Sequence, residues 1–428
     1  MRILVVGAGP AGLTLAHTFE QAGLHDFVIL ERRSEVIIPQ GNTLGIWPHC
    51  IRILDQLGLL DEANKIKTNL TRSCFLAPDG TVLQENKMHD HIEANHGHRF
   101  QLFSRKDFVK LLYDNAPRRS ERILTNKDIV SIHQDDSGVK VTCGDGTSYE
   151  GDVLIGADGV RSQVRRQLFD EDKDTMPFTA EFKAVYGIGP LLPGLRVGDI
   201  VTTHGHGDST LVFVGEQTTY WFVFVKRDEP TQEWSRYSKE QEAELLDKYA
   251  DVPITSDGSV RVRDLRRTAQ YTKLVDLEEG IIPKWHQGRI GLVGDAVHKM
   301  TPYVALGINT GIESAVVLTN ELRKLGEDTS TEAIAQAFEA YQQQRYDRAK
   351  LCLSTSGSSC RMMCWPSWIV EAVSRYVMPW FGAPFVARAL APIMRDSAVL
   401  DSVEEKNHKS GRLPWKFAKV GPNGPNIK

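Results

Sequence analysis

Residues 1–31, MRILVVGAGPAGLTLAHTFEQAGLHDFVILE, decide the fold of this chain. Residues 2–6 have the composition of a short buried strand, and residues 27–30 form a second apolar run that ends in Glu31. Between them lie the G-x-G-x-x-G turn of residues 7–12 and a stretch with helical periodicity. A strand, a glycine-rich turn, a helix and a second strand in this order predict a β-α-β unit that binds a dinucleotide.

Each part of this unit has a physical role. Gly7 permits the tight turn, Gly9 lets the backbone approach a pyrophosphate, and Gly12 lets the helix pack closely on the strand. Ala11, in the same turn, is counted with them as a cofactor-binding position. Glu31 lies nineteen residues past Gly12, where a carboxylate can accept hydrogen bonds from an adenosine ribose. A glycine-rich turn in an ordinary α/β protein would leave this glutamate unexplained.

Bulk properties narrow the class of protein. A chain of 428 residues with 41% hydrophobic and 25% charged residues has room for two domains and the composition of a soluble enzyme. Its net charge of −4 gives no reason to expect a nucleic-acid partner. The six cysteines form no C-x-x-C pair, which predicts reduced thiols. The first predicted strand begins at residue 2, so no signal peptide is expected, and no apolar stretch is long enough to predict a membrane span. A cytoplasmic location is therefore expected.

Later segments predict a second, β-rich domain. Residues 71–85 read as a hairpin, and alternating aromatic-rich segments between residues 178 and 270 predict an antiparallel sheet, interrupted by one charged helix at 239–249. Residues 290–294 return to the parallel-sheet pattern, and residues 310–325 and 331–350 have helical periodicity. The predicted fold class is therefore α/β, with a Rossmann-like domain, an inserted antiparallel β-sheet domain and C-terminal helices.

Between these segments, the chain carries smaller signals. Ser104 is a plausible N-cap for a helix that follows it, and Asp145-Gly146 predicts a turn joining the strand at 139–142 to the strand at 153–155. Residues 89–100 contain His89, His91, His96 and His98. They lack cysteine and regular ligand spacing, so a solvated loop is favoured over a metal site.

Two later motifs favour FAD over NAD as the bound dinucleotide. Gly156-Ala157-Asp158-Gly159 follows a predicted strand, and Gly294-Asp295-Ala296 follows another. Carboxylates at the C-terminal edge of a parallel sheet lie where ligands bind, and Asp295 could accept hydrogen bonds from ribityl or ribose hydroxyls. A helix starting near Ile308 would direct its N–H groups at the flavin pyrimidine edge, where the anion forms on reduction.

Together, GAGPAG at 7–12, GADGVRS at 156–162 and GLVGDAVHKMTP at 291–302 resemble the motifs of group A FAD-dependent monooxygenases, which have the para-hydroxybenzoate hydroxylase-like fold. The HKMTP phrase and the GIESA that follows resemble fungal FAD-dependent epoxidases of the paxilline and meroterpenoid type. The resemblance covers about residues 1–350. It implies FAD as the bound cofactor, with NADPH and O2 as co-substrates.

The resemblance also implies domain boundaries and cofactor contacts. The FAD-binding domain would comprise residues 1–75, 100–177 and 276–350, the substrate domain 76–99 and 178–275, and the C-terminal segment 351–428. The implied contacts are Glu31 at the adenosine ribose, Gly45 near the isoalloxazine, Arg105 on FAD, Asp158 and Gly159 in the motif shared with NADPH, Asp295 at the ribose, and Gly307, Ile308 and Asn309 along the flavin ring.

One departure from the family lies in this last loop. The family's P-x-x-G-x-G-x-N reads PYVALGIN at residues 302–309, so Ala305 replaces a glycine and bulky Leu306 and Ile308 flank Gly307. We expect a loop that is more crowded and more apolar beside the oxygen-reacting carbon.

The chemistry implied by the resemblance belongs to the cofactor. NADPH reduces FAD, O2 adds to give a C4a-hydroperoxide, and its distal oxygen passes to an electron-rich π bond in a dry site. The expected reaction is epoxidation or hydroxylation of an alkene or indole in a lipophilic natural product, such as a prenylated terpenoid or indole alkaloid. A proton donor could assist O–O cleavage. The candidates, each of which could instead only pack in the sheet, are Lys183, Tyr186, Tyr220 and Trp221.

Two alternatives stay open. An aromatic hydroxylase of the salicylate type would use the same cofactors on a phenol. A non-catalytic prenyl-binding escort protein would share the fold, although the complete Gly-Asp motif and flavin loop argue against it.

Residues 365–394 are unusually aromatic and carry only Glu371, Arg375 and Arg388 as charges. Their prolines are expected to break them into short helices. A helical cap or dimer contact is the favoured interpretation, and peripheral contact with a membrane interface is the other. The polar tail from residue 406 is predicted to be extended, with residues 413–417 able to dock.

Overall fold

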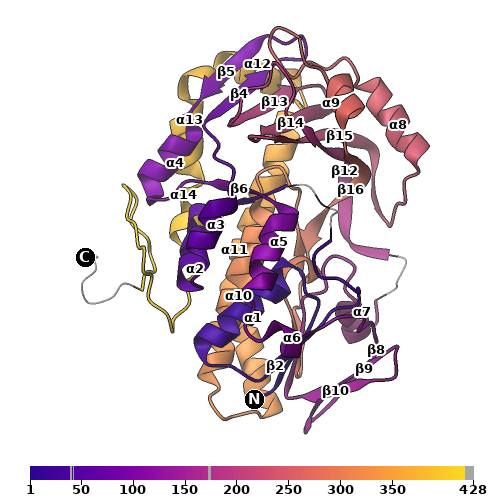
Figure 1. The fold of residues 1–428 in the computed structure, drawn as a ribbon, viewed down its shortest axis with the longest axis vertical. Helices are drawn as coiled ribbons and strands as arrows, with labels where there is room; N and C mark the ends of the chain where they lie inside the picture. Colours follow the sequence, from indigo (N-terminus) through magenta and orange to yellow (C-terminus); the bar gives the residue numbers. More distant parts are fainter. Residues whose placement is uncertain (39–40, 42, 172–174, 420–428) are drawn as a thin grey trace.

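The computed structural model describes residues 1–38, 41, 43–171 and 175–419, and its first domain is built on a six-stranded sheet in the lower part of Figure 1. Its strand order is β17-β18-β11-β1-β2-β7. The strands are β1 (Ile3–Val6), β2 (Phe27–Leu30), β7 (Ile123–Leu124), β11 (Val153–Gly156), β18 (Ile290–Leu292) and β17 (His286–Gln287). All neighbours are parallel except β17, which is antiparallel to β18. The predicted β-α-β unit is therefore confirmed.

Three helices in contact pack beside this sheet. α1 (Pro10–Ala22) packs on α10 (Leu306–Lys324), which packs in turn on α11 (Thr331–Met363). The close approach of α1 to β1 depends on Gly12, because a Cβ there would lie 2.0 Å from the carbonyl oxygen of Gly7. The α11 helix continues thirteen residues beyond the predicted end at residue 350.

An eight-stranded sheet, drawn in the upper part of Figure 1, forms the second domain. Its strands in order are β19 (His298–Lys299), β16 (Tyr271–Ile281), β12 (Thr175–Pro190), β15 (Thr218–Glu233), β14 (Asp208–Val214), β13 (Asp199–His204), β4 (Arg72–Leu76) and β5 (Val82–Asn86). The predicted hairpin β4–β5 joins it through a parallel pairing with β13, while the other pairings are antiparallel. The α/β fold class with an inserted sheet is confirmed.

A small antiparallel sheet corrects one prediction. It consists of β8 (Ile129–Asp135), β9 (Gly138–Cys143) and β10 (Ser148–Gly151). The turn at Asp145-Gly146 joins β9 to β10, not to the strand at 153–156. The sequence analysis missed β10 because four polar or small residues at a sheet edge carry no alternating apolar signal.

The histidine-rich stretch is a helix, so the prediction of a solvated loop was wrong. α4 (Met88–His96) buries His89 and His96, and His98 just beyond it is also buried. The reason is long-range packing, because α13 (Met378–Ala389) lies on α4 and the Trp415 ring is 5.4 Å from that of His96. Among the described residues, no group of His, Cys, Asp or Glu side chains has the arrangement of a metal site.

The remaining elements connect the two sheets and close the C-terminal side. They are β3 (Thr43–Ile46), α2 (Pro48–Gln56), α3 (Leu60–Ile66), β6 (Gln101–Ser104), α5 (Arg105–Asp114), α6 (Arg119–Arg122), α7 (Gln163–Phe169), α8 (Lys239–Lys248), α9 (Val262–Thr268), the 3-10 turn η1 (Gly294–Ala296), α12 (Trp368–Tyr376) and α14 (Ala391–Arg395). Ser104 caps α5 as predicted, accepting a hydrogen bond from the Asp107 N–H. Pro384 lies inside α13 and does not break it.

The tail after α14 folds back onto α2. Arg52 forms a buried ion pair with Glu405, with 2.5 Å between Nη2 and Oε1, and its guanidinium lies 4.1 Å from the centre of the Trp415 ring. The predicted docking of residues 413–417 is thus made by the buried Trp415. The end of the predicted tail, residues 420–428, and Pro39 lie outside the described residues.

Candidate functional site

A cleft of about 680 Å³ lies between the carboxyl ends of the parallel strands and the inner face of the eight-stranded sheet. This edge of a parallel sheet is where dinucleotides bind. The predicted cofactor residues that line the cleft are Gly7, Gly9, Ala11, Glu31, Gly45, Arg105, Asp158, Gly159, Asp295, Gly307 and Ile308. Three motifs separated by more than a hundred residues in the chain therefore meet at one site.

The turn between β1 and α1 fits a pyrophosphate. Gly7 has a φ of 103°, which favours glycine, and a Cβ at Gly9 would meet no described atom within 4 Å. Pro10 occupies the first turn of α1, where the N–H groups of a helix lack intrahelical partners. The open space above Gly9 and the positive end of α1 are the features that a phosphate group requires.

Glu31 is fixed at the end of β2 and faces the same cleft. Its Oε2 accepts a hydrogen bond from the Ala8 N–H at 2.9 Å, and its Oε1 accepts one from the Arg33 N–H at 3.0 Å. These two bonds join the carboxylate to the glycine-rich turn. Because each carboxylate oxygen has two lone pairs, Glu31 can still accept bonds from ribose hydroxyls.

Asp295 and Lys299 form an ion pair at the centre of the cleft, with 2.5 Å between Oδ2 and Nζ. Burial alone would raise the pKa of Asp295, but Lys299 lowers it below its usual value. Burial would lower the pKa of Lys299, but Asp295 and Glu278 raise it. Arg105 lines the same region, and burial lowers the pKa of its guanidinium. An ionised acid between two cations suits a site for the hydroxyls and phosphates of FAD.

Asp158 borders the cleft, but its carboxylate is directed at α7. Its Oδ1 accepts a hydrogen bond from the Ser162 hydroxyl at 2.5 Å, and its Oδ2 accepts one from the Gln163 N–H at 2.7 Å. The side chain thus shapes the loop that contains Gly159, which has a φ of 79°. The role predicted for Asp158 in cofactor contact stays a prediction.

The wall formed by the start of α10 contains the departure noted in the sequence. Ala305 is the N-cap of α10 and has a φ of 54°, a left-handed conformation that favours the glycine it replaces. Leu306 turns into the apolar core, whereas Gly307 and Ile308 line the cleft. A Cβ at Gly45 would lie 2.9 Å from the Ala305 methyl group, so β3 and α10 approach each other closely here.

Asn309 and Gly12 are not among the described residues that line the cleft, so the predicted contact between Asn309 and the flavin ring stays a prediction. Asn309 is wholly buried, and its amide donates to the carbonyl oxygens of Gly45 and Ala305 at 2.8 and 2.7 Å. Its Oδ1 accepts the Trp47 N–H at 2.8 Å. Asn309 therefore positions β3 against α10, since its bonds to Gly45 and Trp47 join the two elements.

The four predicted proton donors divide between two faces of the eight-stranded sheet. Tyr186 lines the cleft, whereas Tyr220 lies on the same face but not among the described cleft-lining residues. Trp221 belongs to the core on the outer face, and Lys183 shares that face with Val185 because side chains alternate along a strand. Lys183 and Trp221 thus face away from the cleft in this structure.

The structure adds cleft residues that sequence reasoning missed. Lys299, four residues after Asp295, is one of them. Lys273 and Glu278, both on β16, and Arg161 also line the cleft. Burial raises the pKa of Glu278. Lys273 and Glu278 lie five positions apart on β16, so the alternation of side chains along a strand does not place both on one face and gave no signal for them.

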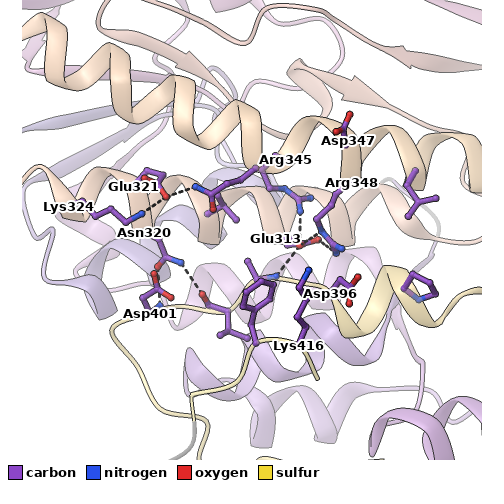
Figure 2. A pocket seen from close by; sticks show the side chains of 17 residues that line it. Glu313, Asn320, Glu321, Lys324, Arg345, Asp347, Arg348, Asp396, Asp401 and Lys416 are labelled. Atoms are coloured by element: carbon purple, nitrogen blue, oxygen red, sulfur yellow. Dashed lines mark hydrogen bonds and ion pairs between the residues drawn. The ribbon is translucent and has the colours of Figure 1, made fainter. Parts of the chain in front are cut away.

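A second pocket, of about 560 Å³, lies between α10, α11 and residues 392–417 (Figure 2). Glu313 lines this pocket, and its Oε1 lies 2.6 Å from Nη1 of Arg345 and 2.8 Å from Nε of Arg348. Glu313 also accepts the Ala398 N–H at 3.1 Å. Because these charges pair with one another, we interpret the pocket as the seam that joins the C-terminal segment to α10.

Comparison with known proteins agrees with this geometry. Residues 1–356 match the model of the family described as FAD binding domain. A relative named FAD-dependent monooxygenase ausM, from Penicillium brasilianum, is 34% identical and aligns over 94% of this chain and 87% of its own length. FAD-dependent monooxygenase andE from Emericella variicolor is 33% identical, over 89% and 83%. Klebsiella pneumoniae HpxO complexed with FAD and uric acid has the same fold, with a TM-score of 0.78, 22% identity, and coverage of 92% of this chain and 96% of that chain.

The chain therefore belongs to the FAD binding domain family of flavoproteins. Within this family it is an FAD-dependent monooxygenase, as the names of its relatives and the cleft geometry agree. The alternative of a non-catalytic escort protein has no support among these relatives.

Proposed function

We propose that this monooxygenase acts in the cytoplasm with NADPH and O2 and epoxidises, or hydroxylates, an alkene or indole of a lipophilic natural product. The observation that carries the proposal is the apolar surface of the eight-stranded sheet opposite the start of α10. Ala184, Phe213, Phe222, Val275 and Leu277 line the cleft there. Such a wall suits a prenylated or polycyclic hydrocarbon, because it offers apolar contact over a wide surface.

Bound FAD would supply the oxygen-transfer chemistry, and the residues of this chain would position it and exclude water. The start of α10 would direct N–H groups at the flavin, because its first turn lines the cleft at Gly307 and Ile308. The aromatic side chains of the sheet would keep the substrate space dry. Relatives from two fungal genera, named as monooxygenases, support an assignment to fungal secondary metabolism.

The test is incubation of the FAD-loaded enzyme with NADPH, labelled O2 and a panel of prenylated indoles, meroterpenoids and simple phenols. We expect NADPH oxidation to be stimulated by a prenylated compound and one labelled oxygen atom to appear at its alkene or indole. A labelled phenol formed from an aromatic acid would instead favour the salicylate-type hydroxylase and overturn the proposal.

Tyr186 is proposed as the proton donor beside the reacting oxygen. Burial raises the pKa of its hydroxyl, which therefore stays protonated at neutral pH and can donate. We expect Tyr186→Phe to lower the rate of product formation about 10²-fold, the lower end of typical acid–base contributions, while FAD content stays unchanged. Tyr220→Phe is the matched control, because Tyr220 lies on the same sheet face outside the cleft lining. Equal product yields for both variants would assign Tyr186 to packing alone.

A further inference from the structure

α12 and α13 lie at the periphery of the molecule (Figure 1). Their exposed side chains are mostly aromatic. The exposed fractions of Trp380, Trp368 and Tyr376 are 80%, 76% and 73%. We define the aromatic patch as these residues with three neighbours on the same two helices, namely Trp368, Ile369, Tyr376, Trp380, Phe381 and Phe385. Large apolar side chains gathered in this way on a monomer mark a binding surface.

The patch is held in a fixed orientation by the opposite side of the same helices. Gly382, Ala383 and Ala387 of α13 are buried against the body of the protein. A Cβ on Gly382 would lie 2.7 Å from the Gln84 amide of β5, so α13 sits closely on the sheet edge. None of the residues of α12, all of which the structure describes, is buried. The two helices are therefore attached to the protein mainly through α13.

Two of the three charged side chains of residues 365–394 pair with each other, whereas Arg388 of α13 is exposed. Glu371 pairs with Arg375, with 2.8 Å between Oε1 and Nε, and with His206 at 3.4 Å. The Arg375 guanidinium lies 5.1 Å from the centre of the buried Trp365 ring. Apart from Arg388, the face that α12 and α13 show to solvent therefore offers ring faces, indole N–H groups and a phenol hydroxyl.

This chemistry fits the interfacial region of a lipid bilayer. Trp and Tyr are enriched where a membrane meets water, because their rings are apolar and their polar tips reach the headgroups. No single helix in the described ranges is long and apolar enough to cross a membrane, whereas α12 and residues 378–395 together reach that hydropathy but are bent by 93°. A bent pair of short helices suits a position in the plane of the interface.

A second copy of the chain fits the patch less well. Protein–protein interfaces carry about one hydrogen bond per 100–200 Å², which requires polar partners on both sides. The patch supplies only the indole and phenol groups of its three Trp and Tyr residues, and its helical backbone is satisfied internally. Lipid tails require no such partners.

The buried side of α13 and of the residues after it is continuous with the apolar lining of the cleft. Ala387, Leu390 and Ile393, from α13 and its C-terminal neighbour, belong to the same buried cluster as Phe213 and Phe222 of the cleft wall. If the substrate is lipophilic, as this step assumes from the proposed function, it would be most concentrated in the membrane. An enzyme docked through α12 and α13 would be held next to that supply.

We propose that the aromatic patch docks this monooxygenase in the plane of a lipid bilayer surface, as a peripheral protein. Burial of apolar rings drives the docking, because the chain as a whole has a net charge of −4, and near the patch Glu371 and Arg375 pair with each other and leave Arg388 as the exposed charge of α12 and α13. The docking is therefore insensitive to salt and needs no anionic lipid.

The experiment is flotation of the full-length, FAD-loaded protein with phosphatidylcholine vesicles, with and without added phosphatidylserine. The wild-type protein floats with both kinds of vesicle at low and at high salt. The triple variant Trp368→Ser, Trp380→Ser, Phe385→Ser partitions at least about tenfold less. Its flavin absorbance and melting temperature stay unchanged, because each replaced side chain is at least 68% exposed. The control Val130→Ser, Val197→Ser removes two exposed apolar side chains elsewhere and leaves flotation unchanged.

Three results would overturn the proposal. The first is absence of wild-type protein from both kinds of floated vesicle, and the second is equal flotation of the triple variant. The third is a wild-type protein that sediments as a dimer and a triple variant that sediments as a monomer, with no flotation of either protein. A second copy of the chain would then cover the patch. Flotation requires no turnover. A failure to oxygenate prenylated compounds would therefore count against the proposed function without affecting the test of membrane docking.

Discussion

Gly9→Ala is expected to weaken FAD binding by roughly 100-fold, about 2.7 kcal/mol, without changing the stability of the cofactor-free protein. The added methyl group would meet no described atom of the protein, and the backbone of Gly9, with φ −77° and ψ −177°, is open to alanine. The same methyl group would occupy the space through which a pyrophosphate approaches the turn. Loss of affinity with unchanged apo stability would therefore locate the pyrophosphate at this residue.

Gly12→Ala separates the two roles of the turn. Its Cβ would lie 2.0 Å from the Gly7 carbonyl oxygen, so we expect a destabilised apo protein, by about 1–3 kcal/mol, together with poor FAD retention. The measurements are chemical denaturation of both apo variants and flavin absorbance after gel filtration. FAD should raise the melting temperature of wild type but hardly that of Gly9→Ala, because bound ligand stabilises in proportion to its affinity. Normal FAD retention by Gly9→Ala would contradict the assigned site.

The sequence alone predicted the cofactor end of the site well because its chemistry is local. Gly7, Gly9 and Glu31 belong to one β-α-β unit of the first 31 residues, and the structure brings them together as expected. Asp295 follows a buried strand, and its placement at the sheet edge needed only the strand itself. Lys299 was overlooked, although it lies only four residues further on, in β19.

The substrate end was predicted poorly because it depends on which face of a strand turns inward. Tyr186 and Phe222 are paired across β12 and β15 and both face the cleft, whereas Lys183 and Trp221, an odd number of positions away along the same strands, face outward. A shift of one residue reverses a strand's faces. The aromatic-rich sequence of β15 is buried on both sides and gives no sign of the choice.

Long-range packing explains the remaining differences. α4 reads as polar because of its histidines, but α13 and the tail bury it, and burial lowers the pKa of His89 and His96 to about 4. The end of α11 lacks helical periodicity, yet Arg361 there forms ion pairs with Glu181 and Glu279 of the eight-stranded sheet. No window of local sequence contains the partners that stabilise these helices.

Glu313→Gln is expected to lower the free energy of unfolding by about 3–5 kcal/mol. Glu313 is 1% exposed and neutralises Arg345 and Arg348, so the amide would leave two guanidinium groups near α11 without their carboxylate. The lost bond to Ala398 would also loosen the C-terminal segment (Figure 2). Glu321→Gln is the matched control on the same helix: its partner Lys324 is 61% exposed, so we expect about 0–1 kcal/mol.

The pH dependence distinguishes a charge effect from a packing effect at Glu313. Burial alone would raise the pKa of this carboxyl, but Arg345 and Arg348 lower it to about 2 from the usual 4.5. A folded-state pKa below the unfolded value stabilises the protein fully above about pH 4.5, and this stabilisation is lost as the pH falls toward 2. The difference in unfolding free energy between wild type and Glu313→Gln, measured by chemical denaturation, should therefore be constant above pH 4.5 and shrink below it. If the charge of Glu313 is the cause, the difference disappears once the carboxylate is protonated. A difference that stays constant down to the lowest pH measured would instead mean that the amide disturbs packing.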